Sequence, residues 1–213
     1  MKKFLFLFGA FALLTGGCAQ KPAGNAAASS TPKPAASTST ASASPRGNEK
    51  KAPSTNPIPA DWIRMADDVK GYEFMVPQGT QHQTQNVEGV DVYLATVPAP
   101  YEVGVIVIAF KDKSLSKDDL LKRAENVLKS MGEKDIKIDS PKELSEDYSL
   151  ANCSSVDEKG KTTKAKILVG TDVTDNYIML VGTDADKFAG NEKTIDEIWG
   201  SFGMYSGGAS GNS

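Results

Sequence analysis

Short runs of alternating apolar and polar residues dominate the middle and end of the chain. Two of them, Trp62–Ala66 and Tyr72–Val76, are separated only by turn-forming residues, a pattern that predicts a β-hairpin. Val90–Val97 alternates in the same way and predicts a third strand. Val103–Phe110 is apolar on both faces, so we expect this strand in the interior of a sheet, with other elements packed on each side.

The next segment changes from strand spacing to helical spacing. Apolar residues recur three and four positions apart from Leu120 to Met131 and form a single stripe. Ser116 stands before the stripe as an N-cap and Gly132 stands after it as a C-cap. These signals predict a long helix between the two capping residues.

Three further strands and a second helix complete the pattern. Tyr148–Val156, Thr162–Thr171 and Tyr177–Thr183 are joined by short turns, which predicts an antiparallel meander. The last helix is expected at residues 192–202, capped by Asn191, because its apolar residues fall on one face.

The predicted elements follow the order ββββαβββα. This order predicts an α+β fold, in which an antiparallel β-sheet of about seven strands packs with two main helices. We expect a single domain over residues 59–204, a common size for one hydrophobic core.

The N-terminus has the pattern of an export signal. Lys2 and Lys3 precede the apolar run Phe4–Leu14, which is about half the length of a bilayer-spanning helix. The run ends in Leu14-Thr15-Gly16-Gly17-Cys18, which resembles the lipobox of bacterial lipoproteins. The resemblance implies a signal peptide at residues 1–17, cleavage before Cys18, and acylation of Cys18 by lipid such as palmitate. The alternative is a secreted soluble protein cleaved after Ala19.

Composition separates the expected domain from both of its flanks. Of the 40 residues 19–58, 27 are Ala, Ser, Thr or Pro and none is aromatic. Such a segment cannot bury enough apolar surface to offset its ordering entropy, so we expect it to be disordered. Together with the lipidated Cys18 that the lipobox resemblance implies, it forms a tether over residues 18–58. The Gly- and Ser-rich residues 205–213 predict a disordered tail.

Charge is distributed unevenly along the chain. The whole chain has 24 Lys and Arg against 27 Asp and Glu, a net charge of −3. Residues 59–213 hold 17 Lys and Arg against 26 Asp and Glu, a net charge of −9, whereas the tether is basic. An acidic domain without a basic stripe repels phosphate backbones, so we expect no nucleic-acid partner.

Three features of the chain occur together: the segment Gly71-Tyr72-Glu73-Phe74-Met75-Val76-Pro77, the two-sided strand before a long helix, and a closing helix that ends in Ser201-Phe202. In these features the chain resembles the PsbP-like superfamily, which includes bacterial envelope lipoproteins of the DcrB type. The resemblance covers about residues 60–204. It implies the superfamily's α+β fold and a non-enzymatic protein with no shared catalytic residues.

Residue types that carry chemistry are sparse. His82 is the only histidine, and its place in Gln81-His82-Gln83 predicts a solvated loop residue rather than a base. Cys153 is expected to be a buried structural thiol. We therefore expect neither catalytic residues nor a cofactor.

Carboxylates near two predicted turns are the remaining candidates for a site. Asp172 and Asp175 flank one turn, and Asp184 and Asp186 follow a second Gly-Thr-Asp phrase. Asp184 and Asp186 are weak candidates for holding a hard cation such as Ca²⁺, which needs six or more oxygen ligands. Turn carboxylates that accept backbone hydrogen bonds explain the same residues without a metal.

These observations predict a non-catalytic envelope lipoprotein, attached to the membrane through its N-terminal lipid. Its domain would act as a protein-interaction or envelope-maintenance module with an envelope protein as partner, on the periplasmic face of the outer membrane. The alternative function is a receptor for a small ligand or cation, with a binding cleft between sheet and helix.

Overall fold

The computed structural model describes residues 49–53, 56–87, 89–112, 115–173 and 175–205. The predicted signal peptide, Cys18 and most of the predicted tether lie outside these ranges. The described elements are, in chain order, β1 (Glu49–Lys51), β2 (Ile63–Asp67), β3 (Tyr72–Val76), β4 (Gln81–Val87), β5 (Val90–Val97), β6 (Val103–Lys111), α1 (Lys117–Ser130), β7 (Lys134–Ile138), β8 (Lys142–Glu143), β9 (Tyr148–Val156), β10 (Thr162–Asp172), β11 (Asp175–Asp184), α2 (Phe188–Gly200) and β12 (Gly203–Tyr205).

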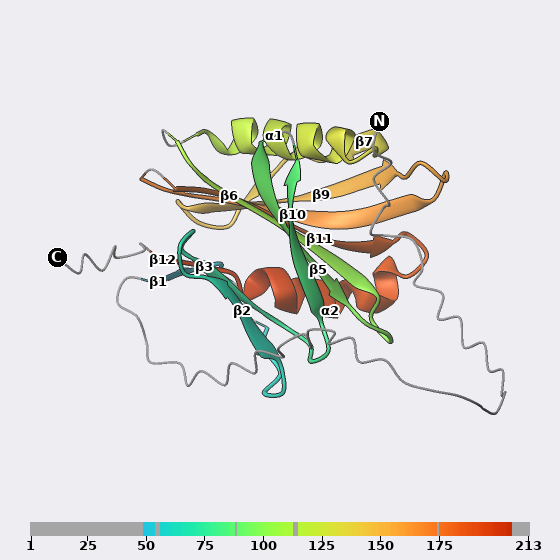
Figure 1. Ribbon diagram of the computed structural model, residues 1–213, viewed down its shortest axis with the longest axis horizontal. Helices are drawn as coiled ribbons and strands as arrows, with labels where there is room; N and C mark the ends of the chain where they lie inside the picture. Colours follow the sequence, from blue (N-terminus) through green and yellow to red (C-terminus); the bar gives the residue numbers. More distant parts are fainter. Residues whose placement is uncertain (1–48, 54–55, 88, 113–114, 174, 206–213) are drawn as a thin grey trace, which may run out of the picture.

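The strands form two antiparallel sheets, and the helices lie on opposite faces of the larger one (Figure 1). The larger sheet has the strand order β4-β5-β6-β11-β10-β9-β7, with β8 paired to β9. The smaller sheet has the order β1-β12-β3-β2. Helix α1 packs on one face of the larger sheet, whereas α2 and the smaller sheet pack on the other. The α+β fold predicted from the sequence is confirmed, with a second sheet added.

Alternation along the central strands divides the interior into two cores. On β6, Val105 and Val107 pack with α2 and the smaller sheet, whereas Ile106 and Ile108 pack with α1. All four side chains are buried. The predicted burial of this strand on both faces is therefore confirmed, and its position between β5 and β11 explains that burial.

Helix α1 begins and ends at the signals seen in the sequence. The Ser116 Oγ accepts a hydrogen bond from the Asp119 backbone N–H at 3.1 Å and caps the N-terminus. At the other end Gly132 has a φ of +95°, and the Glu133 N–H donates to the Leu128 carbonyl at 3.0 Å. This is a Schellman-type ending, which glycine favours because it has no Cβ.

Helix α2 begins earlier than predicted. It starts at Phe188, so Asn191 lies within the helix and the predicted cap at Asn191 is wrong. The Asn191 side chain instead donates to the Tyr101 carbonyl at 2.5 Å and ties the helix to the β5–β6 loop. The predicted apolar face is confirmed, because these side chains are buried: Ile195, Ile198, Trp199 and Phe202.

A buried lysine fixes α2 against the larger sheet. The Lys166 Nζ, on β10, lies 2.5 Å from Asp196 Oδ1 and 3.2 Å from Glu192 Oε1 of the helix. The Trp199 Nε1–H donates to the same Asp196 oxygen at 2.7 Å. A buried charge needs such partners, since an unpaired ammonium in the interior is costly.

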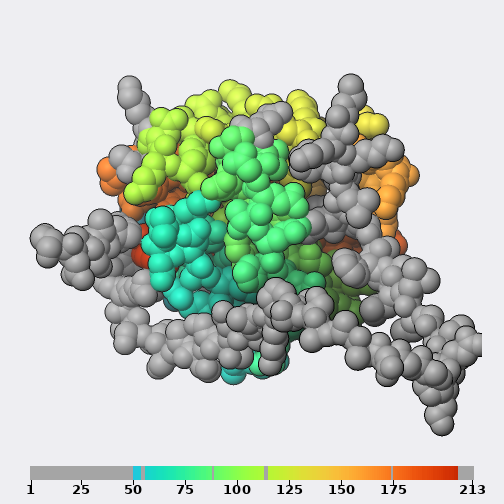
Figure 2. All heavy atoms as spheres, viewed as in Figure 1, coloured from blue at the N-terminus to red at the C-terminus, as the bar shows by residue number. Residues whose placement is uncertain are grey.

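The predicted strands occur, but their arrangement differs in part from the prediction. The β9–β10–β11 meander is confirmed, as is the β2–β3 hairpin, although this hairpin belongs to the smaller sheet. The prediction of a loop at the glutamine-rich segment Gln81-His82-Gln83 is wrong. These residues belong to strand β4, which pairs with β5 over seven consecutive residue pairs. Strands β7 and β8 were not predicted. Figure 2 shows the β4–β5 hairpin in green on the front face of the molecule, beside α1 in yellow-green.

The folded part also extends past the boundaries predicted from the sequence. Strand β1 pairs with β12 through Glu49–Tyr205, Lys50–Met204 and Lys51–Gly203, and Ala52 behind it is buried. The fold therefore begins ahead of residue 59 and includes Tyr205. A polar three-residue strand has no hydrophobic pattern, so its pairing with the far end of the chain left no signal in the sequence.

Candidate functional site

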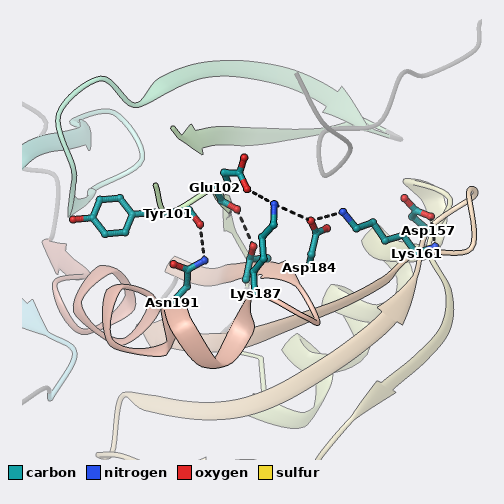
Figure 3. A network of polar contacts seen from close by, with 8 residues as sticks. Tyr101, Glu102, Asp157, Lys161, Asp184, Lys187 and Asn191 are labelled. Atoms are coloured by element: carbon teal, nitrogen blue, oxygen red, sulfur yellow. Dashed lines mark hydrogen bonds and ion pairs between the residues drawn. The ribbon is translucent and has the colours of Figure 1, made fainter. Parts of the chain in front are cut away.

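Two lysines and two carboxylates alternate at one end of the larger sheet (Figure 3). Glu102 in the β5–β6 loop pairs with Lys187, whose Nζ lies 3.6 Å from Asp184 Oδ2 at the end of β11. The same Asp184 oxygen also pairs with Lys161, which precedes β10. We call Glu102, Lys161, Asp184 and Lys187 the charged junction, because it joins four segments that are distant in sequence.

Backbone hydrogen bonds position the side chains of the charged junction. The Asp157 carboxylate accepts from the N–H groups of Lys159 and Lys161, both at 2.8 Å, and fixes the turn before β10. The Thr183 hydroxyl donates to the Glu102 carbonyl at 2.8 Å. This bond restrains a residue whose φ of +50° lies in the left-handed region that non-glycine residues rarely adopt.

The charged junction is built for ion pairing rather than for proton transfer. The hydrogen bond to Glu102 raises the pKa of Lys187, with a smaller contribution from the charge of Asp184. A lysine with a raised pKa keeps its proton at neutral pH, whereas a general base must lose it. The four charges therefore neutralise one another, and their partners are already in place.

The structure separates the two candidates for a cation. The Asp184 carboxylate is buried and faces the ammonium groups of Lys161 and Lys187, whereas Asp186 is exposed. Within the described ranges, His, Cys, Asp and Glu side chains form no group of three or more that could hold a metal ion. The ammonium groups of Lys161 and Lys187 are therefore already paired with the Asp184 carboxylate, which a bound cation would need as a ligand.

The other two candidate carboxylates face each other at the end of the β10–β11 hairpin. Asp172 and Asp175 are register partners. The Asp172 carboxylate lies 3.0 Å from the Lys50 Nζ, which also lies 3.0 Å from Asp147. Asp175 lies 3.9 Å from the Lys111 Nζ. These carboxylates therefore tie strand ends together, and the Lys50 contact links β1 to the larger sheet.

His82 is an exposed strand residue, not a loop residue. Its ring stacks on Tyr93 of β5, with centroids 5.3 Å apart and planes inclined by 17°. The Tyr93 hydroxyl lies 3.3 Å from the Met65 sulfur. His82 thus covers an aromatic side chain at the margin of the core, which is a packing role.

Cys153 is buried on β9, as the sequence predicts, and burial raises the pKa of its thiol to about 12. A thiol with this pKa stays protonated and is a poor nucleophile at neutral pH. It lines a cavity of about 20 Å³ together with Glu133, Ser155 and Thr163. Such a cavity has room for about one water molecule.

The sequence analysis missed the buried carboxyl in this cavity. The Ser155 hydroxyl donates to Glu133 Oε2 at 2.6 Å, and burial raises the pKa of Glu133. Two signals could have located it. Glu133 directly follows the helix-ending Gly132, and Ser155 shares the inward face of β9 with Cys153.

The two edges of the larger sheet differ in how they are protected from other strands. At one edge, β7 carries Lys134, Asp135 and Lys137 and has a register shift against β9. Charges and bulges of this kind discourage edge-to-edge pairing. At the other edge, β4 has no charged residue, no bulge and, among the described residues, no strand on its outer side.

Comparison with known proteins supports the fold. The two antiparallel sheets with two helices form a PsbP-like α+β fold. The solution structure of cyanobacterial PsbP (CyanoP) from Synechocystis matches with a TM-score of 0.52 and 19% identity, covering 68% of this chain and 94% of that chain. The predicted PsbP-like fold is confirmed. No family model and no curated protein matches the sequence.

Two further solved structures are less similar. LpqN of Mycobacterium tuberculosis, which is involved in cell envelope biogenesis, has a TM-score of 0.41 and 14% identity, covering 74% of this chain and 91% of that chain. A Bacteroides thetaiotaomicron protein has a TM-score of 0.46 and 11% identity, covering 70% of this chain and half of its own length. In the described part of this chain, no helix is long and apolar enough to cross a membrane.

Proposed function

We propose that the chain is a non-catalytic envelope lipoprotein whose α+β domain acts as a protein-interaction module. The observation that carries the proposal is that the larger sheet has one unprotected edge, strand β4, whereas its other edge is protected. An edge strand offers backbone N–H and C=O groups to an added strand, a common mode of protein recognition. A module that maintains the envelope would use this edge to hold its partner.

Three features favour binding over catalysis. The charged junction is internally paired, the only histidine packs on Tyr93, and the thiol of Cys153 has a raised pKa.

The alternative function, a receptor for a small ligand, needs a pocket of about 300–1,000 Å³. The cavity beside Cys153 falls far below that size, at about 20 Å³.

The proposed anchor comes from the sequence. Lipidation of Cys18 would attach the chain to a membrane, and the following residues would lead to β1, where the described fold begins. With this anchor, the location we propose for the domain is the periplasmic face of a bacterial outer membrane. A secreted soluble protein remains the alternative location.

Complementation tests the proposed function. Cells that lack the chain are supplied with Gln83→Lys or with His82→Ala and tested for resistance to detergents. We expect Gln83→Lys to fail, because an exposed lysine on β4 discourages strand addition. His82→Ala leaves the backbone edge intact and is expected to complement. Complementation by Gln83→Lys but not by His82→Ala would contradict the β4 edge as the binding site and would indicate a chemical role for the His82 imidazole instead.

A further inference from the structure

We propose that the β4 edge binds the β4 edge of a second copy of this chain, so that the two larger sheets join across a two-fold axis. The inference rests on the proposed function and names the partner for its interaction edge. Two-fold symmetry requires an isologous interface, in which each strand runs antiparallel to its copy. An antiparallel pair of β4 strands meets this requirement with backbone hydrogen bonds alone.

Charge is the first argument for a second copy as the partner. Residues 59–213 carry 17 Lys and Arg against 26 Asp and Glu, so two copies repel each other at most approaches. The stretch from Phe74 to Val87, which includes all of β4, contains no Asp, Glu, Lys or Arg. On the adjoining strand β5, the Asp91 carboxylate lies opposite Asn86 and is paired with Lys70 at 3.7 Å. The β4 edge is therefore a place where two acidic domains can meet without opposing like charges.

Self-complementarity of the strand is the second argument. A full overlap centres the pair on Thr84, which then faces its own copy. The other facing pairs are Gln83 with Gln85, His82 with Asn86, and Gln81 with Val87. Each pair is uncharged, and facing glutamine amides can donate to and accept from each other.

Access to the edge is the third argument. The side chains from Gln81 to Thr84 are exposed on both faces of the strand, so neither core layer covers this half of β4. Figure 2 shows the green β4–β5 hairpin at the surface, with the teal β2–β3 hairpin on its left and yellow-green α1 above it. The seven pairs between β4 and β5 contain no register shift, so no bulge turns this edge away from another strand.

Two double variants test the inference through charge pairing. In the antiparallel pair, Gln83 of one copy faces Gln85 of the other. Gln83→Lys with Gln85→Lys therefore opposes like charges, whereas Gln83→Lys with Gln85→Glu opposes opposite charges at the same positions. Both variants change only polar side chains, the exposed Gln83 and the half-buried Gln85, and unchanged melting temperatures will show that they fold.

Sedimentation equilibrium of the full chain in density-matched detergent measures the result. We expect a reversible dimer in the unchanged chain, tightened by salt because screening weakens the repulsion between acidic domains. The Lys/Lys variant should weaken the dimer at least about tenfold, and the Lys/Glu variant should restore it to within about threefold. A monomer at every salt concentration, or equal effects of the two variants, would overturn the inference.

Cysteine cross-linking in intact cells tests the same geometry. Gln83→Cys, Thr84→Cys and Gln85→Cys are treated in turn with a short bis-maleimide, and at least one of these central positions should give a homodimer band. Gln81→Cys is the matched control, because its two copies would lie about 20 Å apart along the strands. No band at the central positions beyond that of the unchanged chain overturns self-association. A band to a different protein does so as well, while leaving the proposed interaction function intact.

Discussion

Gly170 and Gly182 lie where strands pass a neighbouring group too closely for a side chain. A Cβ on Gly182 would stand 2.6 Å from the Cβ of Ala165 and 2.6 Å from the Lys164 carbonyl oxygen. A Cβ on Gly170 would stand 2.8 Å from Cε1 of the Tyr148 ring. Close packing between β10 and its neighbours therefore explains both glycines of the repeated Gly-Thr-Asp phrase.

Opposite effects are expected from alanine at two glycines. Gly182→Ala should lower the free energy of unfolding by about 1–3 kcal/mol, because backbone atoms on β10 must shift. Gly190→Ala, in α2 with nothing within 4 Å of the added Cβ, should raise it by about 0.5–1 kcal/mol. Urea denaturation of both variants measures the difference. An equal effect of the two changes would mean that β10 and β11 are not packed as described.

At Glu133 the fold opposes the ionisation of a carboxyl group. Burial raises the pKa of its carboxyl, although the Ser155 hydroxyl partly offsets this by donating to it. A carboxyl whose pKa is higher in the folded chain than in the unfolded chain holds its proton more tightly when folded. The pKa of this carboxyl in the unfolded chain is about 4.3. The stability that the protonated form contributes is therefore lost as the pH rises from that value through the pKa in the folded chain.

Replacing Glu133 by glutamine should remove this pH dependence. Glu133→Gln keeps an acceptor for Ser155 but cannot ionise, so its stability relative to the unchanged chain should increase between pH 4 and pH 8. The exposed Glu146→Gln is the matched control and should show no such trend. Thermal unfolding across this pH range measures both. A constant difference between Glu133→Gln and the unchanged chain would show that Glu133 ionises freely in the fold.

At the scale of elements, α1 contributes its stability through one apolar face. Its buried residues are Leu120, Leu121, Ala124, Val127 and Leu128, and all pack on the same side of the larger sheet. Beside this face, Arg123 covers the ring of Phe110 on β6, at 4.0 Å from its centroid, and Phe110 packs against the same core. The helix thus forms one wall of a core that contains no part of the smaller sheet.

Two substitutions on α1 distinguish the buried face of the helix from its exposed face. Leu128→Ala removes a side chain that is 5% exposed and should lower the free energy of unfolding by about 2–5 kcal/mol. Asn126→Ala, on the exposed face, should have an effect within about 0.5 kcal/mol. Denaturant titration of the two variants gives both values. Similar stability of the two would mean that the helix faces are misassigned.

Elements with strong local signals could be predicted from the sequence. Helix α1 has both caps and a full apolar stripe, and β5 has regular alternation, so their positions were predicted correctly. Helix α2 starts without a side-chain cap at Lys187, so its first turn gave no starting signal. Strand β4 is polar on both faces and exists through pairing with β5, which residue type alone does not indicate.

At the scale of the whole molecule, aromatic residues join the two sheets. The ring of Tyr72 on β3 lies 6.0 Å from Phe202 and 6.3 Å from Tyr177 on β11. The Tyr148 hydroxyl, from β9, donates to the Lys50 carbonyl of β1 at 2.7 Å. The smaller sheet is therefore fixed against the larger one at several points.

Long-range contacts also explain why the candidate site could be predicted only in part. Asp184 was singled out as a weak candidate for a cation, but its partners Lys161 and Lys187 come from two different segments. Glu102 joins the same group from the β5–β6 loop, 85 residues before Lys187. Sequence spacing does not reveal which distant charges meet, so it suggested a cation where the fold places ammonium groups.

Photo-cross-linking in intact cells tests whether the domain binds a protein through its β4 edge. Benzoylphenylalanine is placed in the full chain at position 83 on β4 and, as the matched control, at position 137 on the protected β7 edge. We expect a discrete protein adduct from position 83 and none from position 137. No adduct from position 83, or the same adducts from both positions, would contradict it.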